Sequence, residues 1–402
     1  MATNADFTYW NTVNMEAIFR KIKKNGKDFN GKIPVSRMTP QGKYVLGNGG
    51  GWTDGFYIGV LNLAYVLSGD IEFRQLAENY DAFLKLRIQN TDEVNAQNKF
   101  LKLDHDVGMI FLPSAGFGYT FFSGEQNKDI LLKAADILAE RYNVKGKFIR
   151  AWDTWSTDTD PEFIEEKKGK VIIDSLMNIP LLFQASEITG NKKYYDIGYS
   201  HAKTLSQYIV RNDYSTYHTY NFNHTTGEPV VGKTQQGFSN ESCWSRGQSW
   251  AVYGFALAYK YTNDKEFLEK SEKTAEYFMN HLSAVDLPWW DFTAVDKHEF
   301  VPWDASAATV CASGLLELYE LTGKKEHLNN ALRLLRALER FCVTDAYEEC
   351  QPLVLHNTAG PVYCENSLKN LLVCAIDQAS VYADYFYLEC KLKLSSEKRR
   401  IF

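Results

Sequence analysis

The sequence lacks the features that mark secreted, membrane and nucleic-acid-binding proteins. No stretch reaches the roughly 18 uncharged apolar residues of a membrane span, and residues 1–6 lack the basic and apolar regions of a secretory signal. The formal net charge of −6 argues against nucleic acid, which favours a basic surface. We therefore expect a cytoplasmic protein that crosses no membrane and binds no nucleic acid.

Cysteine and histidine patterns exclude several classes of site. All seven cysteines lie from Cys243 onward without CxxC spacing, so we expect reduced thiols. The eight histidines form no HExxH motif or other paired ligand spacing, and no nucleophile elbow is present. We predict no metal and no cofactor.

No linker rich in proline, glycine or serine divides the 402 residues. Length alone would favour two or three domains, but a repeat runs through the whole chain. With 45% hydrophobic residues the chain can bury a large core. We therefore expect residues 1–402 to form a single domain.

The repeat consists of apolar helical runs that end on a stop pair, and successive pairs lie 55, 66, 73 and 60 residues apart. Glycine and asparagine favour the left-handed conformation that ends a helix. A half-polar helical run follows each stop, which is typical of stacked helical hairpins. The stop pairs are Ser68-Gly69, Ser123-Gly124, Thr189-Gly190, Thr262-Asn263 and Thr322-Gly323.

The hairpins predict an all-α fold, an (α/α)6 toroid in which six inner helices are wrapped by six outer ones. The inner helices are apolar on every side and must be buried all round. An open solenoid would match the period, but it usually keeps a tighter repeat length. We expect inner helices at 53–68, 106–122, 174–189, 246–262, 304–322 and 366–388. Outer helices are expected at 8–25, 72–90, 127–143, 192–211, 265–282 and 325–342.

Inner helices that share one direction bring their N-termini to one face of the ring, where seven of nine tryptophans also fall. Tryptophan beside carboxylates and amides is typical of a sugar site. Any one of these rings could equally have a structural role and pack among the loops. Asp54 and Asp304 are expected to cap helices. Asp106 and Asp174 lie in apolar sequence and are each followed by a proline, which predicts a kink. A partly desolvated carboxyl facing another has a raised pKa, as acid–base chemistry requires.

At these residues the chain resembles glycoside hydrolase family 88, the unsaturated glucuronyl hydrolases. The resemblance follows the family's order over most of the chain. It is carried by His105-Asp106-Val107-Gly108, Asp174-Ser175-Leu176-Met177-Asn178, Tyr217-His218-Thr219, Gln236-Gly237-Phe238, Trp244-Ser245-Arg246-Gly247-Gln248-Ser249-Trp250 and Asp384-Tyr385-Phe386-Tyr387.

The resemblance implies an α/α toroid and an enzyme that releases the 4,5-unsaturated uronic acid from lyase-generated glycosaminoglycan oligosaccharides, a small-molecule substrate. It makes Asp174 the general acid and base that hydrates the vinyl ether. Asp106 would hold ring hydroxyls and the Asp174 proton, while His218 and Gln236 would orient the ring and the water.

Further binding roles follow from the same resemblance. Trp52 and Trp244 are expected to stack on sugar rings, and Arg246 to neutralise the uronate or brace the carboxyl pair, unless it forms a structural ion pair. Ser367 and Lys369, placed at the start of the last inner helix, are expected to hold a sulfate, although Ser367 is equally a plain N-cap.

Three alternatives remain open at this point. They are an unsaturated rhamnogalacturonyl hydrolase, an inverting glycosidase with Asp106 as base and Asp174 as acid, and a sugar-binding toroid without catalysis. The sequence does not decide between a monomer and a homodimer.

Overall fold

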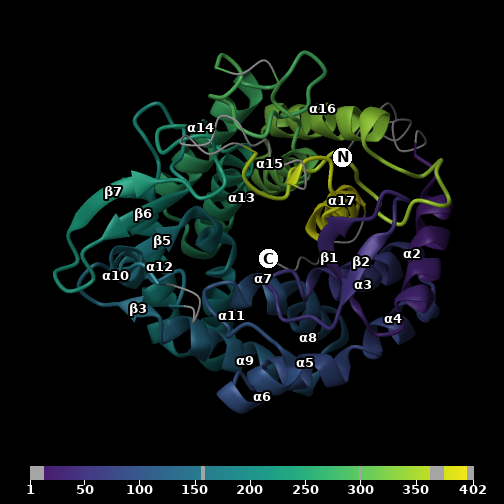
Figure 1. Ribbon diagram of the computed structural model, residues 1–402, viewed down its shortest axis with the longest axis horizontal. Coiled ribbons are helices and arrows are strands. Elements are labelled where there is room, and N and C mark those ends of the chain that lie inside the picture. The colour runs from purple at the N-terminus through teal and green to yellow at the C-terminus, as the bar shows by residue number, and fades with distance from the viewer. Residues whose placement is uncertain (1–12, 155–158, 298–299, 363–374, 396–402) are drawn as a thin grey trace.

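In a computed structural model of the protein, the described residues are 13–154, 159–297, 300–362 and 375–395. Helical segments form an inner ring about a common axis, and other helices wrap its outside (Figure 1). The last inner helix, α17 (Val381–Leu394), packs against both α15 (Ala305–Thr322) and α3 (Phe56–Ser68). That contact between the two ends of the chain closes the ring. The architecture is the predicted α/α toroid and not an open solenoid.

The inner layer owes its burial to apolar sequence on every side of its helices. In α13 (Ser245–Thr262) each residue from Ser245 to Ala258 is buried, which confirms the prediction for these runs. The remaining inner segments are α7 (Val107–Phe111), the π-helical turn η2 (Leu112–Gly116), α8 (Phe117–Phe122), the 3-10 turn η3 (Ile173–Met177) and α11 (Pro180–Thr189).

The outer layer is amphipathic. One face of α16 (Lys325–Phe341) is buried through residues at helical spacing, which include Ala331, Leu334, Leu335 and Leu338, and the other face is exposed to solvent. The other outer helices are α2 (Met15–Phe29), α4 (Ile71–Glu78), α5 (Asp81–Arg87), α9 (Glu125–Ala139), α12 (Lys192–Tyr208) and α14 (Lys265–Asn280). Two short helices, α6 (Asp92–Asn98) and α10 (Pro161–Lys168), lie in connecting segments.

The predicted stops end inner helices in the left-handed conformation. The φ angles are 74° at Gly69, 71° at Gly190, 56° at Asn263 and 69° at Gly323. The hydroxyl before each stop completes the turn: the Thr262 Oγ1 donates to the Ala258 carbonyl at 2.6 Å and accepts from the backbone N–H of Asp264 at 3.2 Å. This pair of hydrogen bonds explains why Thr or Ser precedes Gly or Asn at the helix end. The second stop is shifted by one residue, to Ser123 with φ 55°.

Two inner helices of the structure differ from the predictions made from the sequence. The last one begins at Val381, after Ser380, and not at residue 366. Pro180 does not kink a helix interior; it lies in the first turn of α11, where a missing N–H costs nothing. Pro113, in contrast, lies inside the π-helical turn η2 within a continuous helical run.

Short strands connect the hairpins, and the sequence analysis predicted none of them. The three-stranded sheet has the order β5 (Lys170–Ile172), β6 (Thr219–Phe222) and β7 (Pro229–Lys233), all antiparallel. Two small hairpins pair β1 (Ile33–Met38) with β2 (Tyr44–Gly47) and β3 (Tyr142–Asn143) with β4 (Phe148–Ile149).

Two exclusions from the sequence can be compared with the described part of the chain. Its five cysteines, which are Cys243, Cys311, Cys342, Cys350 and Cys390, are all free thiols. None of its helices combines the length and apolarity that a bilayer crossing requires.

Candidate active site

Pairing between β5 and β6 brings the two central candidates together. Ile172 pairs with Thr219, and the backbone N–H of Ile173 donates to the His218 carbonyl at 3.0 Å. The next residue, Asp174, therefore starts η3 directly beside His218. The Nε2 atom of His218 lies 3.8 Å from the Asp174 Oδ2.

The tautomer of His218 is fixed by its backbone neighbours. Its Nδ1 accepts hydrogen bonds from the backbone N–H groups of Gln235 at 3.0 Å and Gln236 at 3.2 Å. Nε2 therefore carries the proton of the neutral ring and faces the Asp174 carboxyl. Burial, with a smaller effect of the Arg246 charge, lowers the pKa of His218 to about 3. The imidazole is thus a neutral donor at physiological pH.

Asp174 is a buried carboxyl group that can hold a proton near neutral pH. Its side chain is 13% exposed, and its Oδ2 accepts no hydrogen bond from the described residues. Burial raises the pKa of Asp174 to about 7, against the opposing charge of Arg246. Because burial removes the hydration of the anion, the neutral acid is favoured near neutral pH.

Asp106 faces the same space from the start of α7. Burial raises the pKa of Asp106 well above its usual value, and the charges of Asp104 and Asp174 raise it further, while a hydrogen bond from the Asn178 amide opposes them. Burial also raises the pKa of Asp104 to about 6. Several carboxyl groups thus share a site that cannot hold all of their charges.

One group of side chains in the described part of the chain has the atom types and spacing that could hold a metal ion. One atom each from Asp104, His105 and Asp106 lie within 4.8 Å of one another. Burial lowers the pKa of His105 well below its usual value, so the ring is neutral. However, the raised pKa of both carboxyl groups favours protons at these oxygens. The absence of a metal stays a prediction.

Arg246 forms a buried ion pair, the structural alternative considered for it. Its Nη1 donates to the Asp304 carboxylate, to the Ser306 Oγ at 3.2 Å and to the Thr358 carbonyl at 2.8 Å. Its Nη2 donates to the Gln236 Oε1 at 2.8 Å. Asp304 also caps α15, as predicted. Arg246 therefore braces the site from behind, and a direct contact with the substrate stays a prediction.

The tryptophans divide into buried and accessible rings. Trp244 is only 2% exposed, and its ring centroid lies 4.3 Å from that of His218. The guanidinium of Arg246 lies 4.5 Å from the centroid of the Trp244 ring. Two side chains thus cover much of the Trp244 ring, and its stacking on a sugar stays a prediction. Trp52 is half-buried against Tyr382, at 4.9 Å between ring centroids, and remains available for stacking.

Asp54, predicted to cap α3, instead forms a buried ion pair. Its carboxylate accepts from the backbone N–H groups of Gly50 and Gly51 and from the Arg87 Nε at 3.1 Å. It thereby fixes the loop that carries Trp52. Ser367 and Lys369 lie outside the described residues, so their predicted roles are untested.

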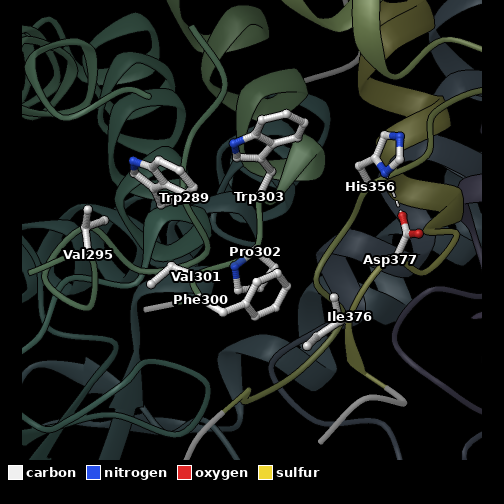
Figure 2. A pocket seen from close by; sticks show the side chains of 9 residues that line it. All are labelled: Trp289, Val295, Phe300, Val301, Pro302, Trp303, His356, Ile376 and Asp377. Carbon is white, nitrogen blue, oxygen red and sulfur yellow. Dashed lines mark hydrogen bonds and ion pairs between the residues drawn. The ribbon is translucent and has the colours of Figure 1, made fainter. Parts of the chain in front are cut away.

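A pocket of about 550 Å³ lies in the loop layer in front of α15 (Figure 2). Trp303, next to Asp304, forms one wall, and Trp289 and Phe300 add aromatic surface. His356 and Asp377 are joined by a contact of 2.7 Å on its other side. Asp106 and Asp174 do not line this pocket. Its aromatic lining suits an apolar or sugar group. Apart from its tryptophans, nothing in the sequence indicated this pocket.

The turn that carries Asp174 is held by residues to which the sequence analysis gave no role. His201, from α12, accepts from the Ile149 N–H at its Nδ1 and donates from Nε2 to the Ser175 Oγ at 2.7 Å. Ser175 in turn donates to the Ile172 carbonyl at 2.5 Å. Ser175 and Asn178 belong to the family motif, but a single sequence does not show their partners.

Comparisons with known proteins show the family of the chain. The model of Glycosyl Hydrolase Family 88 matches residues 25–286. The unsaturated chondroitin disaccharide hydrolase of Streptococcus pyogenes is 31% identical over 94% of this chain and 90% of its own length. The crystal structure of unsaturated glucuronyl hydrolase from Bacillus sp. GL1 is similar with a TM-score of 0.82 at 29% identity, covering 94% of this chain and 95% of that one.

A third similar structure contains a ligand. It is an aspartate-to-asparagine variant of unsaturated glucuronyl hydrolase from Streptococcus agalactiae, complexed with dGlcA-GalNAc6S. Its TM-score is 0.75 at 28% identity, covering 96% of this chain and 93% of that one.

Arg246→Met should lower the free energy of unfolding by about 3–5 kcal/mol, because it leaves the Asp304 carboxylate buried without its charge partner. Arg246→Lys keeps the positive charge and should lose less. Urea titration followed by tryptophan fluorescence measures both values. An Arg246→Met protein as stable as the wild type would show that Arg246 is not a structural brace.

Proposed function

Since the chain belongs to Glycosyl Hydrolase Family 88, we propose that it is an unsaturated glucuronyl hydrolase that acts on glycosaminoglycan fragments. Its substrates are oligosaccharides with a 4,5-unsaturated uronic acid at the non-reducing end. The observation that carries this proposal is a carboxyl group with a pKa of about 7 whose Oδ2 lies 3.8 Å from the Nε2 of a neutral imidazole. The relatives' names, unsaturated glucuronyl and chondroitin disaccharide hydrolase, support the same substrate class.

In the proposed reaction Asp174 gives its proton to carbon 4 of the double bond. Positive charge develops at carbon 5 and is shared with the ring oxygen, so a water molecule adds at carbon 5. The Asp174 carboxylate takes a proton from that water and returns to its starting state. The resulting hemiketal opens and expels the remaining sugar as an alcohol. One carboxyl group thus acts as acid and then as base.

The neighbouring residues supply orientation and charge. The Nε2–H of His218 can donate to a substrate or water oxygen, because its Nδ1 is held by two backbone N–H groups. Gln236 accepts from Arg246 through its Oε1, which leaves its NH₂ group as a donor. Asp106 binds ring hydroxyls, and Trp52 stacks on the sugar. Each of these roles is a proposal from the family resemblance and the geometry of the site.

Several finer points of the function are proposals as well. Binding of a sulfate by Ser367 and Lys369 is consistent with the sulfated disaccharide in the streptococcal complex. A rhamnogalacturonan fragment remains the main alternative substrate. We also propose that residues 1–402 form one catalytic domain, that the protein is cytoplasmic, and that it acts as a monomer or homodimer.

The hydration reaction predicts deuterium at carbon 4 of the released keto-sugar when turnover runs in heavy water. The substrates are unsaturated disaccharides from chondroitin, hyaluronan, heparin and rhamnogalacturonan, and loss of the alkene ultraviolet absorbance reports their turnover. Saturated glycosides are the control and should not react. Mass spectrometry without deuterium at carbon 4, or cleavage of the saturated control, would contradict hydration and favour an inverting glycosidase.

Asp174→Asn should lower kcat by about 10²–10⁴-fold while KM changes little, because the amide cannot transfer the proton. Asp384→Asn is a matched control. Asp384 is also buried with a pKa of about 7, but it binds the Tyr44 hydroxyl and the N–H groups of Leu353 and Val354. Its variant should lose stability and keep kcat. Full turnover by Asp174→Asn would disprove the assignment of the acid.

Activity should fall as pH rises through about 7, because Asp174 must be protonated in the free enzyme to act as acid. Above that pH, kcat/KM should drop about tenfold per pH unit, as expected for the loss of one required proton. A pH–rate profile between 5 and 9, corrected for thermal stability, measures this limb. A flat profile through neutral pH would contradict the proposed protonation state.

A further inference from the structure

His201 connects the outer layer of the ring to the turn that carries Asp174. It lies on α12 and is fully buried. Its Nδ1 accepts a hydrogen bond from the backbone N–H of Ile149, in β4, at 2.9 Å. Its Nε2 lies 2.7 Å from the Oγ of Ser175, the residue that follows Asp174. One imidazole therefore joins an outer helix, a strand and η3.

The direction of both hydrogen bonds follows from the first partner. A backbone N–H can only donate, so the Nδ1 of His201 carries no proton. The neutral ring then has its proton on Nε2 and donates it to the Ser175 Oγ. Burial lowers the pKa of His201 to about 3, so the ring is neutral near physiological pH. These two contacts therefore persist across the range of the pH–rate profile.

Ser175 closes the turn with which η3 begins. Its Oγ donates to the carbonyl of Ile172 at 2.5 Å while it accepts from His201. Its backbone carbonyl accepts from the N–H of Asn178 at 3.0 Å, which continues the chain toward α11. The peptide that carries Asp174 is thus held on both of its sides.

The carboxyl of Asp174 depends on this turn for its position. Its Oδ2 accepts no hydrogen bond from the described residues and lies 3.8 Å from the Nε2 of His218. A small movement of the turn would therefore change both the hydration of the carboxyl and its approach to a substrate. A displacement of about 1 Å in an active site can lower the rate about 10²-fold.

We propose that His201 is a positioning residue for the general acid: its hydrogen bond to Ser175 holds Asp174 at the depth where the carboxyl is shielded from water and faces the substrate. This role rests on the proposed function, in which Asp174 transfers the proton. His201 touches no reacting atom in that reaction. Because its ring is neutral, it acts through geometry and not through charge.

Titratable groups near the acid and near the imidazole bear on any readout from pH. They are Asp106 at the start of α7, Arg246 on α13 and His218 beside β6, which face Asp174, and His105, which faces His201. The variants below leave each of these four groups in the chain. A shift of the pH limb then reports the position of Asp174 and not the removal of a neighbouring charge.

His201→Phe keeps an aromatic ring in the buried site but removes both the acceptor and the donor. The value of kcat should fall about 10- to 100-fold with little change in KM, because the groups that contact the sugar are still present. The basic limb of kcat/KM should move to lower pH, since a carboxyl that regains hydration loses its proton more readily. Unchanged kcat and an unchanged limb in the folded variant would overturn the proposal.

His201→Gln guards against a simple loss of folding. Like the imidazole, an amide has an acceptor and a donor on one carbon atom, so it can bind Ile149 and Ser175 together. Most of kcat and the wild-type position of the limb should return, even if the melting temperature stays low. A folded His201→Gln protein that is as slow as His201→Phe would contradict a role for these hydrogen bonds.

Ser175→Ala removes the group through which His201 acts, and it remains a test if His201→Phe does not fold. Alone, it should lower kcat and shift the limb in the same direction. Combined with His201→Phe, the loss should not exceed that of the slower single variant, because both changes break one connection. Full activity of Ser175→Ala, or losses that multiply in the double variant, would refute the proposal.

Thr204→Val is a matched control on the same helix. Thr204 is buried, and its Oγ1 donates to the Lys147 carbonyl at 2.8 Å, directly before β4. The variant should lower the melting temperature and leave kcat and the pH limb in place, because this partner lies outside η3. A shifted limb in Thr204→Val would show that any loosening of α12 moves Asp174, and the specific role of His201 would be lost.

Infrared difference spectra distinguish a failure of this proposal from a failure of the proposed function. The protonated-carboxyl band that disappears in Asp174→Asn gives the titration midpoint of Asp174 without any substrate. The midpoint should fall in His201→Phe and return in His201→Gln. An unchanged midpoint would overturn the positioning role even in an active enzyme. If the wild type hydrates no unsaturated disaccharide, the proposed function fails while the midpoints still test whether His201 sets the environment of Asp174.

Discussion

Burial of neighbouring carboxyl groups at the mouth of a closed helical ring is the constraint on which the rest of the site depends. Water cannot stabilise the charge of Asp106 and Asp174, so they cannot both be ionised at low cost. Burial raises the pKa of Asp174 to about 7, against the opposing charge of Arg246. The ring supplies this environment because its inner helices are apolar on all sides and close on each other through α17 and α3.

The residues around the pair act mainly by fixing orientation. Backbone N–H groups select the tautomer of His218, and Arg246 holds Gln236 while it is itself bound to Asp304. The His201–Ser175 bridge holds the turn of Asp174. These contacts are made before any substrate binds, so the site needs little reorganisation for a charge that develops at a sugar ring.

Much of the fold could be predicted because its signals are local. The stop pairs end helices through the left-handed conformation of one residue, and the apolar runs require burial whatever their neighbours are. The same local reasoning failed at Pro180, which opens a helix, and at the start of α17, which begins only at Val381. It also missed β5 and β6, since strands of three and four residues carry too little periodicity to be recognised.

The sequence by itself determined the class of fold and the family, and it singled out Asp106 and Asp174 as candidates, because motifs and helix ends are formed by consecutive residues. Only the tertiary structure decided which partners those groups have. Trp244, expected to face a sugar, is enclosed by His218 and Arg246, and Asp54 pairs with Arg87 and caps no helix. The reason is that burial and hydrogen bonding depend on residues distant in the chain, such as Gly108 and Asn178, which meet only when the ring closes.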